Sequence, residues 1–364
     1  MLGIVVFNAV KITEGHGNFF TPLRILFAYL VLLGHAFVIV RGGDHTEPHI
    51  FYQFTMSYIA VNLFFIASGF LVSASMMYRK APANFISARV LRIFPALIVH
   101  VFLIMLIFGP LTTNLGLWEY FSSPQTLLQP VLVLSFVETH MYLPGIVPNN
   151  HEHMASAALW TLRYEVLAYI GTLIAFSLGL MKHRWMIAAQ FAVFAIALPI
   201  SLSTGLYEEL PATFQSILRF GMCYGLGAVF YAYREHINFR VALIPVLFAV
   251  TALTHNSAVF EVFFTITLGY ALFWCAYIKV PKLEFMQKIS DISYGIYIYH
   301  WAVLQAVFHF MPQVNVFEII LIATPITLVL ATLSWNIVEK PALKLKSRFA
   351  ERLKISKTKP VFNT

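Results

Sequence analysis

The stretch PLRILFAYLVLLGHAFVIV, from Pro22 to Val40, decides the fold class of this chain. Almost every residue in it is apolar, and its length and composition are those of one membrane-spanning helix. The stretch nevertheless carries two ionisable side chains, Arg24 and His35. An ionisable group inside a bilayer costs roughly 2.5–3.5 kcal/mol on insertion scales, so each of the two is by default a candidate for function.

The rest of the chain has the composition of an integral membrane protein. Of 364 residues, 59% are hydrophobic and only 11% are charged, whereas soluble domains are roughly 45–50% apolar and 25% charged. The sequence predicts an all-α integral membrane protein with about ten transmembrane helices. The expected spans lie near residues 20–40, 57–77, 93–109, 159–180, 185–203, 212–233, 239–256, 258–278, 291–311 and 316–337.

The net charge of +8 follows from membrane topology and does not require a nucleic-acid partner. If the N-terminus is cytoplasmic, 20 of the 24 Lys and Arg residues fall in cytoplasmic segments, and the outer loops hold only Arg41. The positive-inside rule therefore predicts that both termini are cytoplasmic. Three arginines remain within expected spans: Arg24, Arg163 and Arg219.

These patterns divide the chain into three parts. Residues 1–19 are expected to be a cytoplasmic leader, residues 20–338 the ten-helix membrane domain, and residues 339–364 a basic cytoplasmic tail. The tail is typical of an amphipathic segment that lies on anionic membrane lipids. The longest loop, Pro110 to Ala158, contains the apolar run Leu127 to Val137, which is too short to cross a membrane and is expected to be re-entrant or interfacial.

Arg24 and His35 are predicted to share one face of the first helix. They are eleven residues apart, which brings them to within about 20° of the same direction and about 16 Å along the axis. The functional interpretation is a polar stripe that faces the interior of the bundle. The alternative is that Arg24 reaches the inner headgroups while His35 makes a single hydrogen bond between helices.

Further motifs resemble those of one family. They are VNLFFIASGFLV (Val61 to Val72), ARVLRIFPAL (Ala88 to Leu97), LWTLRYE (Leu159 to Glu165), SYGIYIYHW (Ser293 to Trp301) and VEKP (Val338 to Pro341). Together with the arginine and histidine of the first span, they resemble the acyltransferase-3 family. These membrane enzymes transfer acyl groups, most often acetyl, onto lipopolysaccharides, exopolysaccharides and peptidoglycan. Asn62 departs from the family's commonest form, VDLFF, and supplies no negative charge at that position.

The resemblance implies ten helices around a central cavity, a cytoplasmic acyl-CoA donor and a glycan acceptor outside. It also implies that His35 is the catalytic base and Arg24 an essential partner. Elementary chemistry is compatible with this, since a sugar hydroxyl attacks well only when a base removes its proton, and histidine suits that task. Arg24 could orient the donor's phosphates or polarise its thioester carbonyl. An acyl-histidine intermediate remains an alternative.

Arg89 and Arg92 are expected to act together as donor-binding residues. They are three residues apart and so share a helix face. The resemblance of RVLRIFP favours a clamp for the phosphates of coenzyme A, while the alternative is ordinary positive charge beside a span. No metal is expected.

The fourth expected span contributes three candidates. An unpaired carboxylate at Glu165 would be costly, so it could bond to the acceptor sugar, orient His35, or pair with Arg163 or Arg219. Trp160 could stack on a sugar ring or anchor the helix at the interface. We group Glu165 with the catalytic residues, and Trp160 and Arg163 with the acceptor.

In the ninth expected span, Tyr294, Tyr297 and His300 recur every three residues and should form one polar face along the central cavity. His300 is expected to be structural or to contact substrate. Ser68 could be a nucleophile, although small residues more often allow close helix packing. We group Ser68, Tyr297 and His300 with the donor-binding residues.

The sequence therefore predicts an enzyme of the bacterial inner membrane that transfers an acyl group, expected to be acetyl from acetyl-CoA, to a glycan. The motifs LWTLRYEV and SYGIYIYHW most resemble the exopolysaccharide branch, and the acceptor could be lipid-linked. A transporter or flippase for a glycan intermediate is the alternative from another class, because intramembrane Arg, His and Glu also mark transport pathways. A third interpretation keeps the enzyme but changes the donor, for example to succinyl, or the acceptor to a small secreted molecule.

Overall fold

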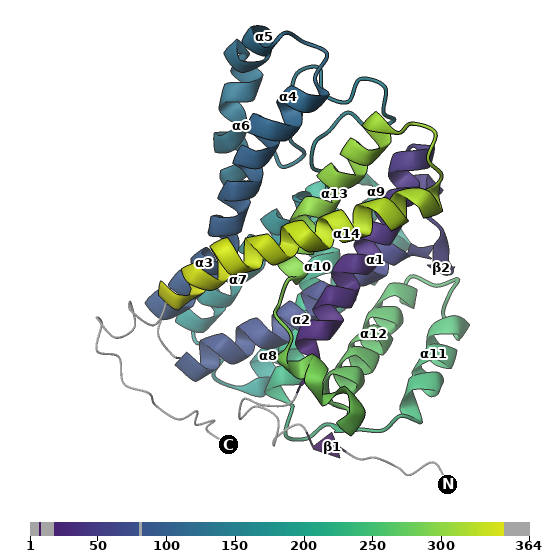
Figure 1. The fold of residues 1–364 in the computed structure, drawn as a ribbon. Coiled ribbons are helices and arrows are strands. Elements are labelled where there is room, and N and C mark those ends of the chain that lie inside the picture. The colour runs from purple at the N-terminus through teal and green to yellow at the C-terminus, as the bar shows by residue number, and fades with distance from the viewer. Residues whose placement is uncertain (1–6, 9–17, 80–81, 346–364) are drawn as a thin grey trace.

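The computed structural model describes residues 7–8, 18–79 and 82–345, and this part of the chain is almost entirely helical (Figure 1). The long helices are α1 (Phe20–Arg41), α2 (Met56–Arg79), α3 (Pro82–Leu103), α7 (Trp160–Ser177), α8 (Arg184–Thr204), α10 (Ala212–Ala232), α12 (Phe260–Tyr277), α13 (Ser293–Phe310) and α14 (Val316–Ser334). The expected all-α class is confirmed. Most of the tail and of the leader lies outside the described residues.

Shorter elements connect these helices. They are the α-helices α4 (Gly109–Thr112), α5 (Leu117–Ser122), α6 (Pro124–Leu134), α9 (Leu206–Glu209) and α11 (Leu243–Leu253), the π-helical segments η3 (Ile104–Phe108) and η5 (Trp335–Glu339), and the 3₁₀ segments η2 (Asp44–Thr46) and η4 (Pro281–Lys288). Strand β1 (Phe7–Asn8) pairs antiparallel with β4 (Asn238–Phe239), and β2 (His49–Phe51) pairs with β3 (Phe54–Thr55) just before α2.

Six helical segments of the described chain are long and apolar enough to cross a membrane. They are Phe20–Arg41, Met56–Tyr78, Pro82–Thr112, Arg184–Thr204, Phe260–Tyr277 and Val316–Leu345. The other four expected spans coincide with α7, α10, α11 and α13, of which α11 has only 11 residues. The chain is thus a multi-pass membrane protein, while ten spans and cytoplasmic termini stay predictions.

The third helix begins earlier than the sequence predicts. It starts at Pro82 and not near residue 93, so Arg89 and Arg92 lie within the helix and not in front of it. Because Arg89 and Arg92 interrupt the apolar run, the sequence pattern did not reveal the first part of this helix. Beyond η3 and α4 the chain turns back, and α6 packs against α3 (Figure 1). The 11-residue α6 covers most of the run Leu127 to Val137 and is too short to span, as expected.

The centre of the bundle is formed by α1, α2, α10 and α13. Nearly every residue of α13 is buried, which explains why its sequence is apolar or aromatic on all sides. Helices α2 and α10 cross at glycines: a Cβ atom on Gly69 would lie 2.0 Å from the carbonyl oxygen of Tyr224, and one on Gly227 would lie 2.0 Å from that of Ile66. The SGF motif of the second span therefore permits close helix packing.

Candidate active site

A cavity of about 270 Å³ lies where α1, α2, α3, α7 and the start of α13 meet. Its floor and walls combine apolar side chains with an unusual number of polar and charged ones. The polar and charged lining residues are Arg24, Ser68, Arg89, Arg92, Thr161, Glu165, Tyr169, Asp291, Ser293, Tyr294 and Tyr297. This cavity brings together residues from four of the five motifs of the sequence analysis. The fifth motif, VEKP, contributes Glu339, which forms an ion pair with the lining residue Arg92.

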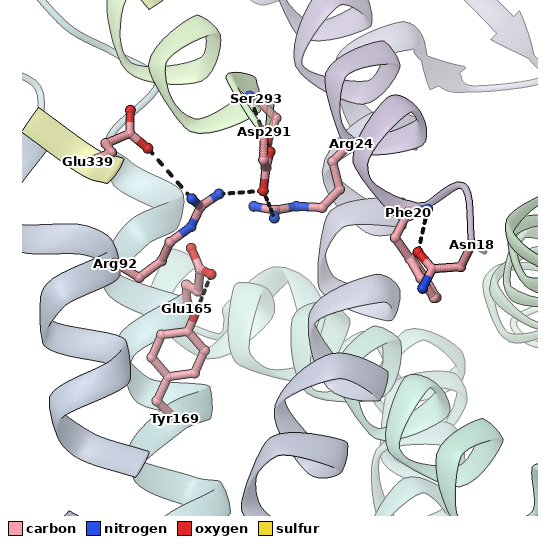
Figure 2. A network of polar contacts seen from close by, with 9 residues as sticks. All are labelled: Asn18, Phe20, Arg24, Arg92, Glu165, Tyr169, Asp291, Ser293 and Glu339. Atoms are coloured by element: carbon pink, nitrogen blue, oxygen red, sulfur yellow. Dashed lines mark hydrogen bonds and ion pairs between the residues drawn. The ribbon is translucent and has the colours of Figure 1, made fainter. Parts of the chain in front are cut away.

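Four segments far apart in sequence are joined by ion pairs beside this cavity (Figure 2). The carboxylate of Asp291 lies 2.6 Å from Nη1 of Arg24 and 2.8 Å from Nη2 of Arg92. Nη1 of Arg92 lies 3.6 Å from Glu339, which is buried at the end of η5. This network ties together the first turns of α1, the middle of α3, the loop before α13 and the end of η5.

Asp291 is held in its charged form by this network. It lies in the loop between η4 and α13, and it also accepts hydrogen bonds from the hydroxyl and the amide of Ser293. Burial by itself would raise the pKa of Asp291, but the guanidinium groups of Arg24 and Arg92 outweigh it and lower this pKa to about 2. The aspartate is therefore ionised throughout the physiological range.

Arg89 differs from the other two cavity arginines. Its guanidinium lies over the rings of Phe85 and Tyr169, at 5.8 and 5.4 Å from their centroids. No ion pair joins Arg89 to a carboxylate among the described residues, and its Nε is buried without a hydrogen-bond partner. Of the predicted pair, Arg92 is thus engaged by carboxylates, while Arg89 presents a cation to the cavity that is stacked only on aromatic rings.

Glu165 lines the cavity and accepts a hydrogen bond from the hydroxyl of Tyr169, one helical turn further along α7 (Figure 2). The two ion pairs considered for it from the sequence are not formed. Arg163 donates to the carbonyl oxygens of Phe136 and Val137 in the loop after α6. Arg219 donates through Nε to Asn62.

His35 makes its main contacts with α13. Its Nδ1 lies 2.8 Å from Nε2 of His300, the two rings are stacked with centroids 5.0 Å apart, and the indole of Trp301 meets His35 edge-on. His300 is fully buried, and its other ring nitrogen, Nδ1, lies 3.1 Å from the carbonyl oxygen of Ile296. The imidazole of His35 therefore faces the interior of the bundle.

Arg24 and His35 point towards the same neighbour. Arg24 reaches Asp291 directly before α13, and His35 reaches His300 within it. This agrees with the shared face predicted from their eleven-residue spacing, and it places the two groups about 16 Å apart along α1. The cavity surrounds the Arg24 end of this stripe, and His35 lies deeper along the same helix.

The remaining residues of the α13 face also meet the cavity. Tyr294 donates to the carbonyl oxygen of Ile93, and the hydroxyl of Tyr297 lies 2.6 Å from that of Thr161 on α7. Both tyrosines line the cavity, whereas His300 lies beyond it beside His35. Ser68 also lines the cavity, next to Gly69, at which α2 meets α10.

Both residues grouped with the acceptor, Trp160 and Arg163, lie outside the cavity lining. Arg163 fixes the loop after α6, and its contacts are backbone carbonyls and not the cavity. The Trp160 ring packs against Tyr164 and Phe220, so it contributes to the hydrophobic core where α7 meets α10. The sequence could not separate these positions from the cavity side, because α7 has lining residues on one face only.

Arg219 and Asn62 explain the one visible departure from the family pattern. Nε of Arg219 lies 2.8 Å from the side-chain oxygen of Asn62, and the guanidinium stacks at 3.3 Å on the ring of Tyr58. An amide oxygen thus serves where an aspartate would form an ion pair. The chain keeps the contact and gives up the charge.

The long loop after α6 is tied down over the far end of α13, near His35. The side chain of Gln305 donates to the carbonyl oxygens of Glu152 and Met154, at 2.7 and 3.0 Å, and accepts from Asn150 at 2.6 Å. Trp301, which contacts His35, donates to the same carbonyl of Met154. The segment 150–154 is thus held in place beside the proposed base.

Two members of the charged network were missed by sequence reasoning. Asp291 stands two residues before the SYGIYIYHW motif, and Glu339 lies inside VEKP, a motif that carried the resemblance but no assigned role. The signal for Asp291 was present: three arginines at one end of a bundle need carboxylate partners, and an acid at the boundary of a span is a natural candidate.

Comparison with known proteins identifies the family of this chain. Residues 19–336 match the model of a family described as an acyltransferase domain. The chain belongs to the acyltransferase-3 family. No solved structure matches it significantly.

Two relatives of this acyltransferase-3 chain are similar over nearly their whole length. Nodulation protein 10 of Rhizobium leguminosarum bv. viciae is 26% identical over 370 residues, covering 94% of this chain and 98% of the relative. An O-acetyl transferase of Shigella phage Sf6 is 26% identical over 347 residues, covering 91% and 97%.

Proposed function

We propose that this protein transfers an acyl group, in the first instance acetyl, from a cytoplasmic acyl-CoA to a hydroxyl of an exopolysaccharide or lipid-linked glycan outside the bacterial inner membrane. The observation that carries the proposal is the stripe on α1, with a guanidinium in a charged cavity at one end and a paired imidazole further in. Family membership and the Sf6 relative support acyl transfer as the reaction class.

The charged cavity is suited to the donor. Coenzyme A carries several phosphate charges, and Arg24, Arg89 and Arg92 supply guanidinium groups that match phosphate geometry. Arg89 is the most available of them because it has no carboxylate partner among the described side chains. With the phosphates at this end, the pantetheine arm would extend along α1 towards His35, over the roughly 16 Å that separate the two levels.

The reaction at His35 is then a direct transfer. The unprotonated ring nitrogen of His35 takes the proton of the acceptor hydroxyl while the oxygen attacks the thioester carbonyl. A C–O bond forms, the C–S bond breaks, and the leaving thiolate takes the proton from the imidazolium, which releases CoA as a free thiol. The products are an ester on the glycan and a regenerated neutral histidine.

The loop segment 150–154, which Gln305 and Trp301 hold in place, is suited to bind the acceptor. Segment 150–154 lies over the outer half of α13 through Gln305 and Trp301, and Trp301 contacts His35. A glycan that approaches from this side must pass the loop before it reaches the base. Acceptor selection is accordingly assigned to this loop, and Glu165 is assigned to the inner cavity rather than to the acceptor's entrance.

Deleting the gene tests the function. The ester content of surface and secreted glycans, measured by proton NMR, should fall in the deletion strain. It should return with the wild-type gene and not with His35→Ala. Unchanged ester signals in the deletion strain would contradict the proposal.

Donor binding separates the enzyme from a transporter. Acetyl-CoA at about 100 times its Kd should stabilise the purified protein by about 2.7 kcal/mol. Succinyl-CoA and free CoA, tested in parallel, report whether the acyl group or the nucleotide is recognised. No thermal stabilisation by any of the three would favour a transporter.

A further inference from the structure

The hydrogen bond between His35 and His300 has a direction, and that direction fixes the tautomer of both rings. Two neutral imidazoles can share one hydrogen bond in either direction, and the direction decides which nitrogen of each ring holds the hydrogen. The surroundings of His300 settle that direction here.

Nδ1 of His300 lies 3.1 Å from the carbonyl oxygen of Ile296, one turn earlier on α13. A carbonyl oxygen only accepts, so this Nδ1 must be the donor and carry the hydrogen. In a neutral imidazole the other nitrogen, Nε2, is then an acceptor. His300 is fully buried, and no described carboxylate forms an ion pair with it, so the neutral ring is the favoured form.

The acceptor nitrogen of His300 faces Nδ1 of His35 at 2.8 Å. Nδ1 of His35 must therefore donate, and the lone pair of His35 is left on Nε2. His35 is half-buried, and no described residue hydrogen-bonds to its Nε2. The one basic nitrogen of the pair is thus free to meet a hydroxyl.

We propose that His300 is a positioning residue that fixes the tautomer and orientation of His35, so that Nε2 of His35 is the base of the acyl transfer. The chain Ile296 carbonyl, His300, His35 does for this histidine what a carboxylate does in a catalytic triad, but with a neutral partner suited to a membrane interior. This inference rests on the proposed function for its catalytic meaning, and it goes beyond the structural or substrate-contacting role expected from the sequence.

Packing around the pair supports the assignment. The stacked rings of His35 and His300 and the edge of Trp301 leave the His35 ring few orientations. Trp301 is itself held by its bond to Met154. His100, the other buried histidine near α13, packs edge-on against Tyr299, and neither of its ring nitrogens has a hydrogen-bond partner among the described residues. It therefore offers no competing partner to His35.

The test reads the tautomer directly. The full chain, labelled with ¹⁵N-histidine and purified in detergent, is examined by ¹⁵N NMR, with His35 assigned by comparison with His35→Gln. We expect protonated Nδ1 and unprotonated Nε2 on His35 in the wild-type protein. Protonated Nε2 on His35 would overturn the proposal, and this measurement needs no variant of His300 to fold.

Kinetics of two variants give the second readout. His300→Gln keeps an oxygen that can accept from His35, and it should retain kcat to within about tenfold; His300→Leu cannot accept, and kcat should fall roughly 100-fold, with KM for the donor changed less than about threefold. His309→Leu, on the same helix but outside the pair, is the matched control and should change neither.

Equal kcat for His300→Gln and His300→Leu would also overturn the proposal. If the wild-type protein transfers no acyl group at all, the proposed function fails, while the ¹⁵N spectrum still decides the tautomer. The two failures are therefore distinguishable.

Discussion

The carboxylate of Asp291 lies 2.6 Å from the guanidinium of Arg24, although the two residues are 267 positions apart in the chain. This contact fixes the beginning of α1 against the loop that leads into α13, the helix that also holds His35 through His300. One helix pair therefore carries both ends of the proposed donor path, and the ion pair keeps them in register.

Replacing Asp291 with asparagine should destabilise the protein strongly. Arg24 and Arg92 would both lose their closest carboxylate, and removing one partner of a largely buried ion pair costs roughly 3–5 kcal/mol. Thermal unfolding of the purified variant measures the loss. Asp44→Asn, at an exposed aspartate in η2, is the control and should stay within about 0.5 kcal/mol of wild type.

The cost of Asp291→Asn should depend on pH in one direction. The pKa of Asp291 is lowered from 3.8 to about 2 in the folded protein, so its stabilising effect is complete above the unfolded value and is lost as the pH falls towards 2. The difference in Tm between wild type and variant should be constant from about pH 8 to 5 and should shrink below about pH 4. A gap that already halves at pH 6 would contradict the ion-pair assignment.

Arg89→Gln should weaken donor binding without destabilising the fold. Arg89 has only aromatic contacts to lose, and hydrogen bonds to a charged group are worth about 1.5–3 kcal/mol, so KM for acyl-CoA should rise about 10- to 100-fold. Arg92→Gln should instead lower Tm, because it leaves Glu339 buried without its cation.

The control for this pair is Arg184→Gln, at a half-buried arginine that contacts His236 outside the cavity. It should leave both KM and Tm unchanged. If Arg89→Gln and Arg184→Gln have the same donor KM, Arg89 does not bind the donor.

Gln305→Leu should raise KM for the acceptor and leave KM for the donor unchanged. The substitution removes the side-chain bonds to Asn150, Glu152 and Met154, while the bond from Asn150 to the backbone carbonyl of residue 305 remains. Each lost bond is worth about 1 kcal/mol, so an effect of roughly tenfold or more is expected. Steady-state kinetics with each substrate varied in turn make the measurement. The matched control is Gln190→Leu, whose side chain bonds carbonyls at the other end of the bundle.

Gly69→Ala should destabilise the helix crossing that supports the cavity wall. The added Cβ would meet the carbonyl oxygen of Tyr224 at 2.0 Å, so α2 and α10 must move apart, at a cost of about 1–3 kcal/mol or more. Gly171→Ala is the contrasting control: nothing lies within 4 Å of its Cβ position, and the change in a helix interior should stabilise by up to about 1 kcal/mol. Equal Tm changes for the two would refute the close crossing.

The sequence predicted the helical class, six of its spans and the shared face of Arg24 and His35, because each depends on local composition or on the period of one helix. It did not predict that α3 begins at Pro82, since Arg89 and Arg92 interrupt the apolar run by which a span is recognised. The sequence likewise did not predict where Arg163 and Trp160 lie, because their positions depend on which face of α7 packs against which neighbouring helix or loop.

The charged network shows the same division. The arginines were visible as intramembrane or flanking charges, but their partner Asp291 comes from the other end of the chain. The contact of His35 with His300 is also long-range, and the residue that fixes its direction is a backbone carbonyl, which no sequence motif records. The contacts between residues far apart in the chain, Arg24 with Asp291 and His35 with His300, are known only from the structure.

The most direct test of the central claim is acyl transfer by the His35→Gln variant. Membrane vesicles are supplied with acetyl-labelled acetyl-CoA on the cytoplasmic side, and alkali-labile label in the glycan fraction is measured over time. The account predicts a rate at least roughly 100-fold below wild type, with donor binding intact by thermal stabilisation. Transfer by His35→Gln at the wild-type rate would contradict it.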